Sequence, residues 1–225
     1  MLRLSVVIPT LNAAATLPTT LAALVSGDAI EREMVVVDGG SDDGTPALAE
    51  TLGATVVAAS KGRGGQLAAG AAATEAPWLL FLHADTRLQA GWSGDVLAFA
   101  GDAANRDKAA VFRFALDDQV DGARRLERRV AWRTRVLGLP YGDQGLLISR
   151  ALYSDIGGFR AMPLMEDVDI VRRLGRARLV TLPSAAVTSA ERYRGSYFWR
   201  SARNVTCLCL YFVGVPPRWL VRLYG

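Results

Sequence analysis

A carboxylate and an imidazole stand two residues apart, directly after an apolar run. His83 is the only histidine in the chain, and Asp85 follows it in the segment His-Ala-Asp-Thr. Side chains of these types can hold a divalent ion whose other ligands are substrate phosphates; Mg²⁺ often binds in this way, and Mn²⁺ tolerates imidazole better. Alternatively, Asp85 caps the next segment and His83 is a buried, hydrogen-bonded histidine. We favour a metal role for Asp85 and leave both interpretations open for His83.

Another carboxylate lies on a segment with helical periodicity. In residues 165–174, Asp167 shares one helix face with three apolar residues at the spacing i, i+3, i+4 and i+7. A partly buried carboxylate there could act as a general base toward a hydroxyl group. Glu166 and Asp169 fall on another face, and the helix macrodipole explains acids in a first turn. The macrodipole does not explain an acid on the apolar face.

Two glycine-rich segments could bind a nucleotide. Residues 38–45 read Asp-Gly-Gly-Ser-Asp-Asp-Gly-Thr, in which an acid can accept hydrogen bonds and glycines let the backbone approach a ligand. Residues 61–66, Lys-Gly-Arg-Gly-Gly-Gln, combine cations with a helix N-terminus, which favours anions. An ordinary turn explains the first segment equally well. The second has neither the spacing of a P-loop nor that of a dinucleotide-binding fingerprint.

These segments follow the strands of a regular strand–helix alternation. The strands are continuously apolar, which predicts parallel strands covered on both faces and a doubly wound α/β sheet. Ligands bind beyond the carboxyl ends of such strands, where the polar residues described above gather. The predicted strands are residues 4–8, 34–37, 54–59 and 78–82, and the predicted helices are residues 17–25, 46–52 (with Thr45 as N-cap) and 66–74.

The second half of the chain is less regular. It predicts strands at residues 110–115, 145–148 and 178–182, and helices at residues 121–137 and 165–174. No repeat or linker divides the chain. We therefore expect one domain over residues 1–190, followed by a basic, aromatic helical segment over residues 191–225 that packs on the domain, on a partner subunit or on a membrane.

The composition is that of a globular protein in a reducing compartment. The chain has 225 residues, of which 51% are hydrophobic, enough for a sizeable core. Cys207 and Cys209 are too close for an ordinary disulfide and have no nearby Cys or His partner. The N-terminal apolar run is too short for a signal peptide, and no run reaches the ~20 residues of a membrane span. We therefore expect a cytoplasmic protein.

Nearly all the basic residues, which give a net charge of +4, are arginines. They crowd residues 121–137 and mix with aromatic residues near the C-terminus: Arg192, Tyr193, Arg194, Tyr197, Phe198, Trp199, Arg200 and Arg203. Basic, aromatic helices can lie on anionic bilayers, at the inner face of the membrane. The alternatives are a solvated face and a helix packed on the core or on the partner in a homodimer. No DNA-reading motif accompanies the arginines, so a nucleic-acid partner is disfavoured.

Taken together, the motifs resemble glycosyltransferase family 2, whose members have the GT-A fold. Residues 5–12, Ser-Val-Val-Ile-Pro-Thr-Leu-Asn, resemble the family's first strand and donor loop, and residues 38–45 are similar to its Asp-Gly-Ser-x-Asp-Gly-Thr motif. Residues 83–85 stand where the Asp-x-Asp metal motif belongs, and residues 166–167 are similar to the catalytic Glu-Asp motif. The four motifs keep the family's order over roughly residues 4–175.

The resemblance implies transfer of a sugar from a nucleotide-diphosphate sugar to an acceptor hydroxyl, with inversion and with Mn²⁺ or Mg²⁺ as cofactor. It implies that Asp167 is the catalytic base and that Asp85 and His83 are metal ligands. The donor-binding residues that it implies are Pro9, Thr10, Asn12, Asp38, Gly40, Ser41, Lys61, Arg63, Gln66, Ala84 and Asp85. The acceptor-binding residues that it implies are Gly142, Asp143, Gln144 and Glu166.

The sequence departs from the family pattern in three respects. His83 replaces the first acid of Asp-x-Asp, no later histidine can add a metal ligand, and the chain is short. The segment His-Ala-Asp-Thr is similar to that of a small bacterial subgroup of the family.

Two other functions fit the same architecture. A sugar-phosphate nucleotidyltransferase would need a basic, glycine-rich loop near residues 9–16 to hold a nucleoside triphosphate, and this sequence has none there. A non-catalytic protein that binds nucleotide sugars would bind the donor without turnover and would leave Asp167 without a role. We therefore prefer a transferase, whose sugar, nucleotide and acceptor the sequence does not identify.

Overall fold

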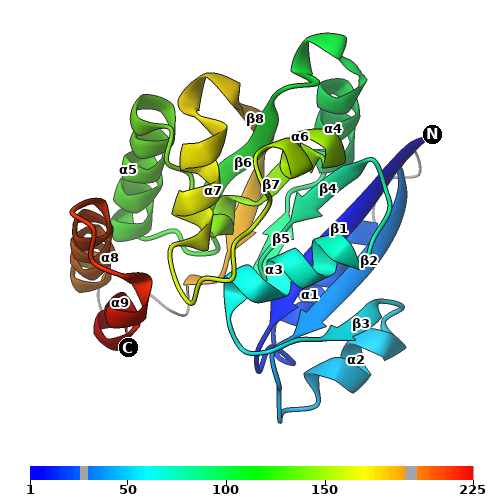
Figure 1. The fold of residues 1–225 in the computed structure, drawn as a ribbon, viewed down its shortest axis with the longest axis horizontal. Coiled ribbons are helices and arrows are strands. Elements are labelled where there is room, and N and C mark those ends of the chain that lie inside the picture. The colour runs from blue at the N-terminus through cyan, green and yellow to red at the C-terminus, as the bar shows by residue number, and fades with distance from the viewer. Residues whose placement is uncertain (26–29, 191–196, 225) are drawn as a thin grey trace.

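In the computed structural model, which describes residues 1–25, 30–190 and 197–224, helices cover both faces of an eight-stranded sheet (Figure 1). The strand order is β3-β2-β1-β4-β7-β6-β8-β5. The strands are β1 (Leu2–Thr10), β2 (Ile30–Asp38), β3 (Thr55–Ala58), β4 (Trp78–Phe81), β5 (Thr86–Leu88), β6 (Ala109–Leu116), β7 (Leu146–Ser149) and β8 (Leu179–Thr188). The α-helices are α1 (Leu17–Val25), α2 (Thr45–Thr51), α3 (Arg63–Ala72), α4 (Trp92–Gly101), α5 (Asp121–Leu137), α6 (Arg150–Asp155), α7 (Glu166–Leu174), α8 (Tyr197–Phe212) and α9 (Pro217–Tyr224). Short 3₁₀ turns are η1 (Ala103–Asn105), η2 (Gly142–Gln144) and η3 (Arg176–Arg178).

The sheet is mixed but mostly parallel. β1 pairs in parallel with β2 and β4, β2 with β3, and β6 with β8. β7 runs antiparallel to β4 and β6 and so joins the two parallel parts, while β5 is antiparallel to β8. The expected α/β fold with a mostly parallel sheet is confirmed.

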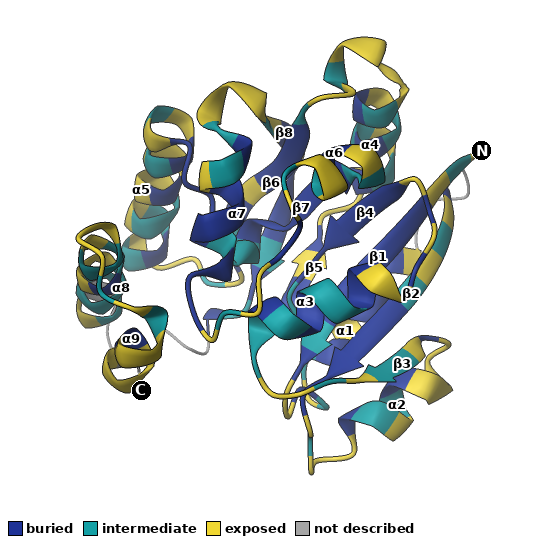
Figure 2. Cartoon of the chain, viewed as in Figure 1, coloured by how far each residue is buried: buried dark blue, intermediate teal, exposed yellow. Residues whose placement is uncertain are grey.

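Strand β1 explains why the sheet needs cover on both sides. Leu4, Val6 and Ile8 pack into one apolar cluster, with α1 and α4, whereas Val7 packs into a second, with α3 and α7. Because successive side chains of a strand point to opposite faces, a continuously apolar strand must be covered on both faces of the sheet. Figure 2 shows β1 and β4 buried in the middle of the molecule.

Several predicted boundaries shift by a few residues. Gly44, with φ 83°, is the N-cap of α2, so the predicted cap Thr45 is the first helical residue instead. Helix α3 begins at Arg63, three residues before the predicted start at residue 66. The N-cap of α7 is Met165, with φ 67°. Glycine adopts a left-handed cap without a steric penalty, which explains the first shift.

The described part of the C-terminal segment packs on the domain. Cys207 of α8 and Leu220 of α9 are buried in the same apolar cluster as α3 and α7. No helix in the described residues is both long and apolar enough to cross a membrane. Arg192, Tyr193 and Arg194, which the sequence analysis placed in a basic, aromatic patch, lie outside the described residues, as do the side chains of Tyr197 and Phe198.

Candidate active site

A cleft of about 710 Å³ opens beyond the carboxyl ends of the parallel strands. The predicted donor-binding residues that line it are Pro9, Thr10, Asn12, Lys61, Arg63, Gln66, Ala84 and Asp85. They come from the end of β1 and the loop after it, from the segment after β4, and from the beginning of α3 with the loop before it, which are segments far apart in the sequence. The structure therefore brings six polar residues, with Pro9 and Ala84, together at the expected edge of the sheet.

The remaining predicted donor residues are Asp38, Gly40 and Ser41, and they support the cleft without lining it. The carboxylate of Asp38 accepts hydrogen bonds from the Thr10 hydroxyl (2.9 Å), from the Ser41 hydroxyl and amide (2.5 and 2.8 Å) and from the Gly40 amide (2.9 Å). Burial alone raises the pKa of Asp38, but the hydrogen bonds outweigh burial and hold its pKa below the usual value. Asp38 is thus an anionic anchor for its own loop, and its contact with a nucleotide base stays a prediction.

The loop after β1 is fastened to the glycine-rich loop after β2. The Asn12 amide donates to the Ser41 hydroxyl (2.8 Å), and the Asn12 side-chain oxygen accepts from the Asp42 amide (3.0 Å). The Ala14 amide donates to the Asp43 carboxylate (2.9 Å). Asn12 has φ 53°, a conformation that asparagine tolerates better than most residues. The acids Asp38 and Asp43 of the glycine-rich loop therefore shape the rim of the cleft.

Gln66 fixes α3 against the sheet. Its side-chain nitrogen donates to the carbonyls of Thr10 and Val37, both at 2.7 Å. Both amide protons are thereby used inside the protein. Gln66 lines the cleft, but its nitrogen acts as a clamp between α3 and the ends of β1 and β2.

A smaller cavity of about 70 Å³ adjoins the cleft and contains the predicted base. Asp167 lies half-buried at the beginning of α7, where its Oδ2 atom accepts a hydrogen bond from the Gly142 amide (2.9 Å) and its Oδ1 atom from the Val168 amide (2.8 Å). Four residues line both spaces: Arg63, His83, Asp85 and Ser189. The two spaces therefore meet at the side chains predicted to bind metal and phosphate.

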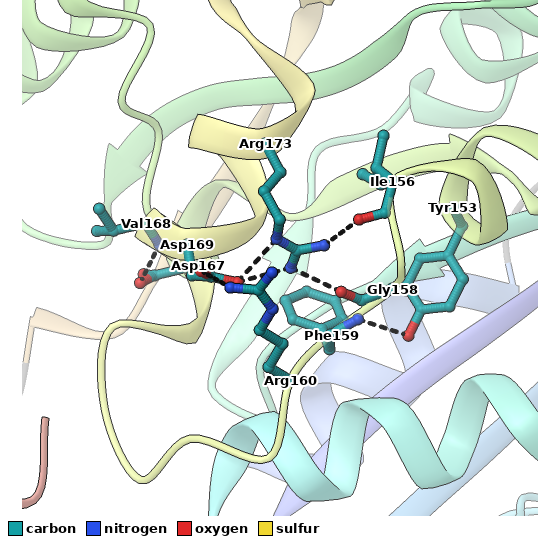
Figure 3. A network of polar contacts seen from close by, with 9 residues as sticks. All are labelled: Tyr153, Ile156, Gly158, Phe159, Arg160, Asp167, Val168, Asp169 and Arg173. Carbon is teal, nitrogen blue, oxygen red and sulfur yellow. Dashed lines mark hydrogen bonds and ion pairs between the residues drawn. The ribbon is translucent and has the colours of Figure 1, made fainter.

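The other acids of α7 are more buried than the sequence suggested. Glu166 is only 2% exposed, and its Oε1 atom lies 3.3 Å from Nη1 of Arg63. Burial raises the pKa of Glu166 to about 7, although Arg63 opposes this rise. Asp169 is buried as well and bonds Arg160 (3.1 Å) and Arg173 (2.6 Å) (Figure 3). Both acids are stabilised inside by cations: Arg63 pairs with Glu166, and Arg160 and Arg173 pair with Asp169.

Asp143 belongs to the same group of carboxylates. Burial raises its pKa to about 6; Arg133 opposes this rise, and the charges of Asp167 and Asp85 add to it. Its Oδ1 atom is buried and has no hydrogen-bond partner among the described residues. Like charges of this kind favour a positive group beside them, because it would offset their repulsion. Within the described chain, however, no three His, Cys, Asp or Glu side chains form a ready-made metal site.

The profile of glycosyl transferase family 2 matches residues 5–164, which is more than half of the chain and includes the residues after β1 and β4 that line the cleft. The chain belongs to glycosyl transferase family 2. The expected family is confirmed, although the fourth motif, residues 166–167, lies just beyond the matched range. A search of curated proteins found no match to the chain.

Solved structures share the fold of this chain at low sequence identity, and the chain spans only 40% and 59% of the length of the first two. TarS of S. aureus is 18% identical, with a TM-score of 0.65 over 93% of this chain and 40% of that chain. The mannosyltransferase PcManGT of Pyrobaculum calidifontis, in complex with GDP-Man and Mn²⁺, is 20% identical, with a TM-score of 0.68 over 88% of this chain and 59% of that chain. Glucosyl-3-phosphoglycerate synthase of Mycobacterium tuberculosis, in complex with Mn²⁺, UDP and glucosyl-3-phosphoglycerate, is 21% identical, with a TM-score of 0.61 over 95% of this chain and 81% of that chain. The expected GT-A fold is confirmed.

One predicted acceptor residue lies outside both cavities. Gln144 is 1% exposed and lines neither cavity. Its side-chain nitrogen donates to the Phe112 carbonyl (3.0 Å), and its oxygen accepts from the Thr134 hydroxyl (2.9 Å). Gln144 therefore ties η2 to β6 and α5, and the structure gives it a core role in place of the expected position facing the acceptor.

The structure adds residues to the site that the sequence analysis missed. Tyr141 and Ser189 line the smaller cavity, together with Arg200 and Asn204 of α8. Arg200 had drawn notice only as part of a basic patch, and Asn204 carried no sequence signal. The cavity wall that α8 supplies could not be anticipated, because only tertiary packing brings this helix against η2 and α7.

Proposed function

We propose that this glycosyltransferase moves a sugar from a nucleotide-diphosphate sugar to an acceptor hydroxyl, with inversion at the anomeric carbon. The observation that carries the proposal is the junction of the two cavities at Arg63, His83 and Asp85. A donor in the larger cleft would place its diphosphate at this junction. Its anomeric carbon would then point toward Asp167 in the smaller cavity.

The roles of the protein groups follow from this placement. The Gly142 amide holds the Asp167 carboxylate in the cavity, ready to take the proton of the acceptor hydroxyl as the hydroxyl attacks. Lys61 and Arg63, which line the cleft, would stabilise the negative charge on the departing nucleoside diphosphate. The bond from the anomeric carbon to the phosphate oxygen breaks, and a glycosidic bond forms on the opposite face.

We also propose a divalent cation, Mn²⁺ or Mg²⁺, held by Asp85 with His83. Two neighbours carry Mn²⁺ together with a nucleotide or nucleotide sugar, and others of this fold carry UDP or UDP-GlcNAc. When bound, such an ion would supply positive charge to the diphosphate. The carboxylates of Asp85, Asp143 and Asp167 all line the smaller cavity, and carboxylate oxygens suit a cation of this kind.

The test begins with a thermal-shift panel of UDP- and GDP-sugars, with and without Mn²⁺, to find the donor. Asp167→Asn should then lower turnover by about 10²–10⁴-fold while leaving donor binding intact, because the variant cannot accept the proton. Near-normal turnover of a folded Asp167→Asn protein would show that another group is the base. Treatment with EDTA should abolish transfer; activity that survives EDTA would remove the metal from the proposal.

The location of the protein is also a proposal. Cys207 and Cys209 are both free thiols, which agrees with a cytoplasmic protein. We propose that helices α5, α8 and α9, which lie side by side (Figure 1), contact the anionic inner face of a membrane. They carry the exposed tryptophans Trp132, Trp199 and Trp219, at 54%, 73% and 50% exposure. Arginines accompany these rings: Arg125, Arg128 and Arg129 line a shallow groove with Trp132, and Arg222 lies 4.8 Å from the Trp219 ring. Tryptophan and arginine together suit a headgroup surface of negative charge.

Co-sedimentation with vesicles tests the membrane contact. Binding should occur with phosphatidylglycerol vesicles, be absent with phosphatidylcholine and weaken in high salt. A variant with serine at positions 132, 199 and 219 should lose it. Equal binding by this variant, or dimers in sedimentation that bury the same tryptophans, would overturn the membrane assignment.

A further inference from the structure

Two buried oxygen atoms in the smaller cavity have no hydrogen-bond partner among the described residues. They are Oδ1 of Asp143, in the turn η2, and Oδ1 of Asn204, in helix α8. Both residues line the cavity that contains Asp167. Buried polar atoms are nearly always hydrogen-bonded, so two such oxygens in one small cavity indicate a bound group.

The nature of the two atoms narrows the kind of group. Both are oxygens with lone pairs, and the amide oxygen of Asn204 cannot be satisfied by taking up a proton at neutral pH. The Asp143 carboxylate lines the same cavity as the carboxylates of Asp85 and Asp167. A cation that seeks oxygen ligands would meet both oxygens and offset the negative charge, which a neutral hydroxyl would not do.

The position of His83 also favours oxygen ligands. A Cβ atom on Gly142 would lie 2.5 Å from Nε2 of His83, so this edge of the imidazole packs against the backbone of η2. The sequence, moreover, lacks the first acid of Asp-x-Asp and any later histidine. Ligands are therefore needed from elsewhere in the chain if the cation of the proposed function is to be held.

We propose that Asp143 and Asn204 are ligands, with Asp85, of a divalent cation, Mg²⁺ or Mn²⁺, whose remaining positions are filled by diphosphate oxygens of the donor. This inference rests on the proposed function and deepens it. The ligand set explains why the described acids and histidine do not form a closed metal site by themselves: an amide oxygen and the substrate are both required. Cation binding then ties α8 to the catalytic cavity, so that the C-terminal segment completes the site.

Binding of Mn²⁺ to the full chain tests the ligand set directly, by the loss of the free-ion signal in electron paramagnetic resonance. The titration is done with Mn²⁺ alone and with UDP or GDP present. Asp143→Asn and Asn204→Leu should each weaken Mn²⁺ binding in the presence of nucleotide by at least about tenfold, and Asn204→Asp should strengthen it. Thr206→Ala, an exposed position on the same helix, should bind as the unchanged protein does.

Hydrogen exchange gives a second reading that does not depend on activity. Mn²⁺ with nucleotide should slow exchange in residues 197–212 of the unchanged protein and leave Asn204→Leu unaffected. If Asp143→Asn and Asn204→Leu both bind Mn²⁺ normally while Asp85→Asn does not bind it, the proposed ligands are wrong and the metal of the proposed function stands. If the unchanged protein binds no Mn²⁺ with either nucleotide, the ligand set and the metal of the proposed function fail together, whereas Asp167→Asn still tests the transfer.

Discussion

Replacing Glu166 by glutamine should make the protein more stable at alkaline pH and leave its stability at acidic pH nearly unchanged. The carboxylate is 2% exposed and has one cationic neighbour, Arg63, at 3.3 Å. Removal from water raises its pKa from the ordinary 4.5 to about 7, with the attraction of Arg63 already included. An amide of the same shape has no charge to bury.

The sign and size follow from the pKa. A folded-state pKa above the unfolded value means that the native protein binds the proton more tightly, so the associated stability is present below pH 4.5 and is lost as pH rises through about 7. At about 1.4 kcal/mol per pH unit, the loss amounts to about 3 kcal/mol for Glu166. The variant does not lose this stability as the pH rises. Its free energy of unfolding at pH 8 should therefore exceed that of the unchanged protein by up to about 3 kcal/mol.

Urea denaturation at pH 5, 6, 7 and 8 measures the difference in unfolding free energy between the two proteins. Glu50→Gln, at an exposed position on α2, is the matched control and should show a difference that does not vary with pH. The reasoning is refuted if the Glu166→Gln difference is the same at pH 5 and pH 8, or if the variant is the less stable protein at pH 8.

Two pairs of glycine substitutions test the packing around the site. On α3, Gly70→Ala would place Cβ 2.3 Å from a valine methyl of β1 and should cost about 1–3 kcal/mol, whereas Gly65→Ala meets no atom within 4 Å and should stabilise the helix by up to about 1 kcal/mol. Thermal unfolding should shift in opposite directions, and a shared direction would contradict the close approach of α3 to the sheet. Gly142→Ala should displace His83, whose Nε2 atom lies 2.5 Å from the new Cβ, and lower transfer by about tenfold to a hundredfold. Gly94→Ala on α4, where no atom lies within 4 Å of the new Cβ, should transfer sugar at the normal rate. A normal rate in Gly142→Ala as well would show that transfer does not require the placement of His83.

Much of the fold could be predicted because it depends on consecutive residues. Helices α1 and α5 begin and end at the predicted residues, since their start, period and end are all local properties. Strand β5 and helices α4 and α6 were not predicted from the sequence. β5 has three residues and gains its stability from pairing with β8, far along the chain, so no local pattern reports it.

The site divides in the same way. Asp167 was found because an acid on an apolar helix face has no local explanation, and the motifs around Asp38 and Asp85 follow strands that the sequence predicts. Glu166, Gln144 and Asn204 are surrounded by residues from other elements. The spacing of residues along the sequence therefore does not indicate that these side chains lie inside the protein.

By itself, the sequence determined the family, the parallel half of the sheet and the edge at which polar residues gather, because strand direction and side-chain period place strand ends together. The tertiary structure alone decided which of those polar groups face the cavities and which make hydrogen bonds inside the protein. Asp38 and Gln66 lie near the donor cleft, yet their hydrogen bonds are made within the fold. Asn204 enters the site only because α8 packs against the catalytic half. A buried polar group is defined by the atoms that surround it, and those atoms come from segments that only the folded chain brings together.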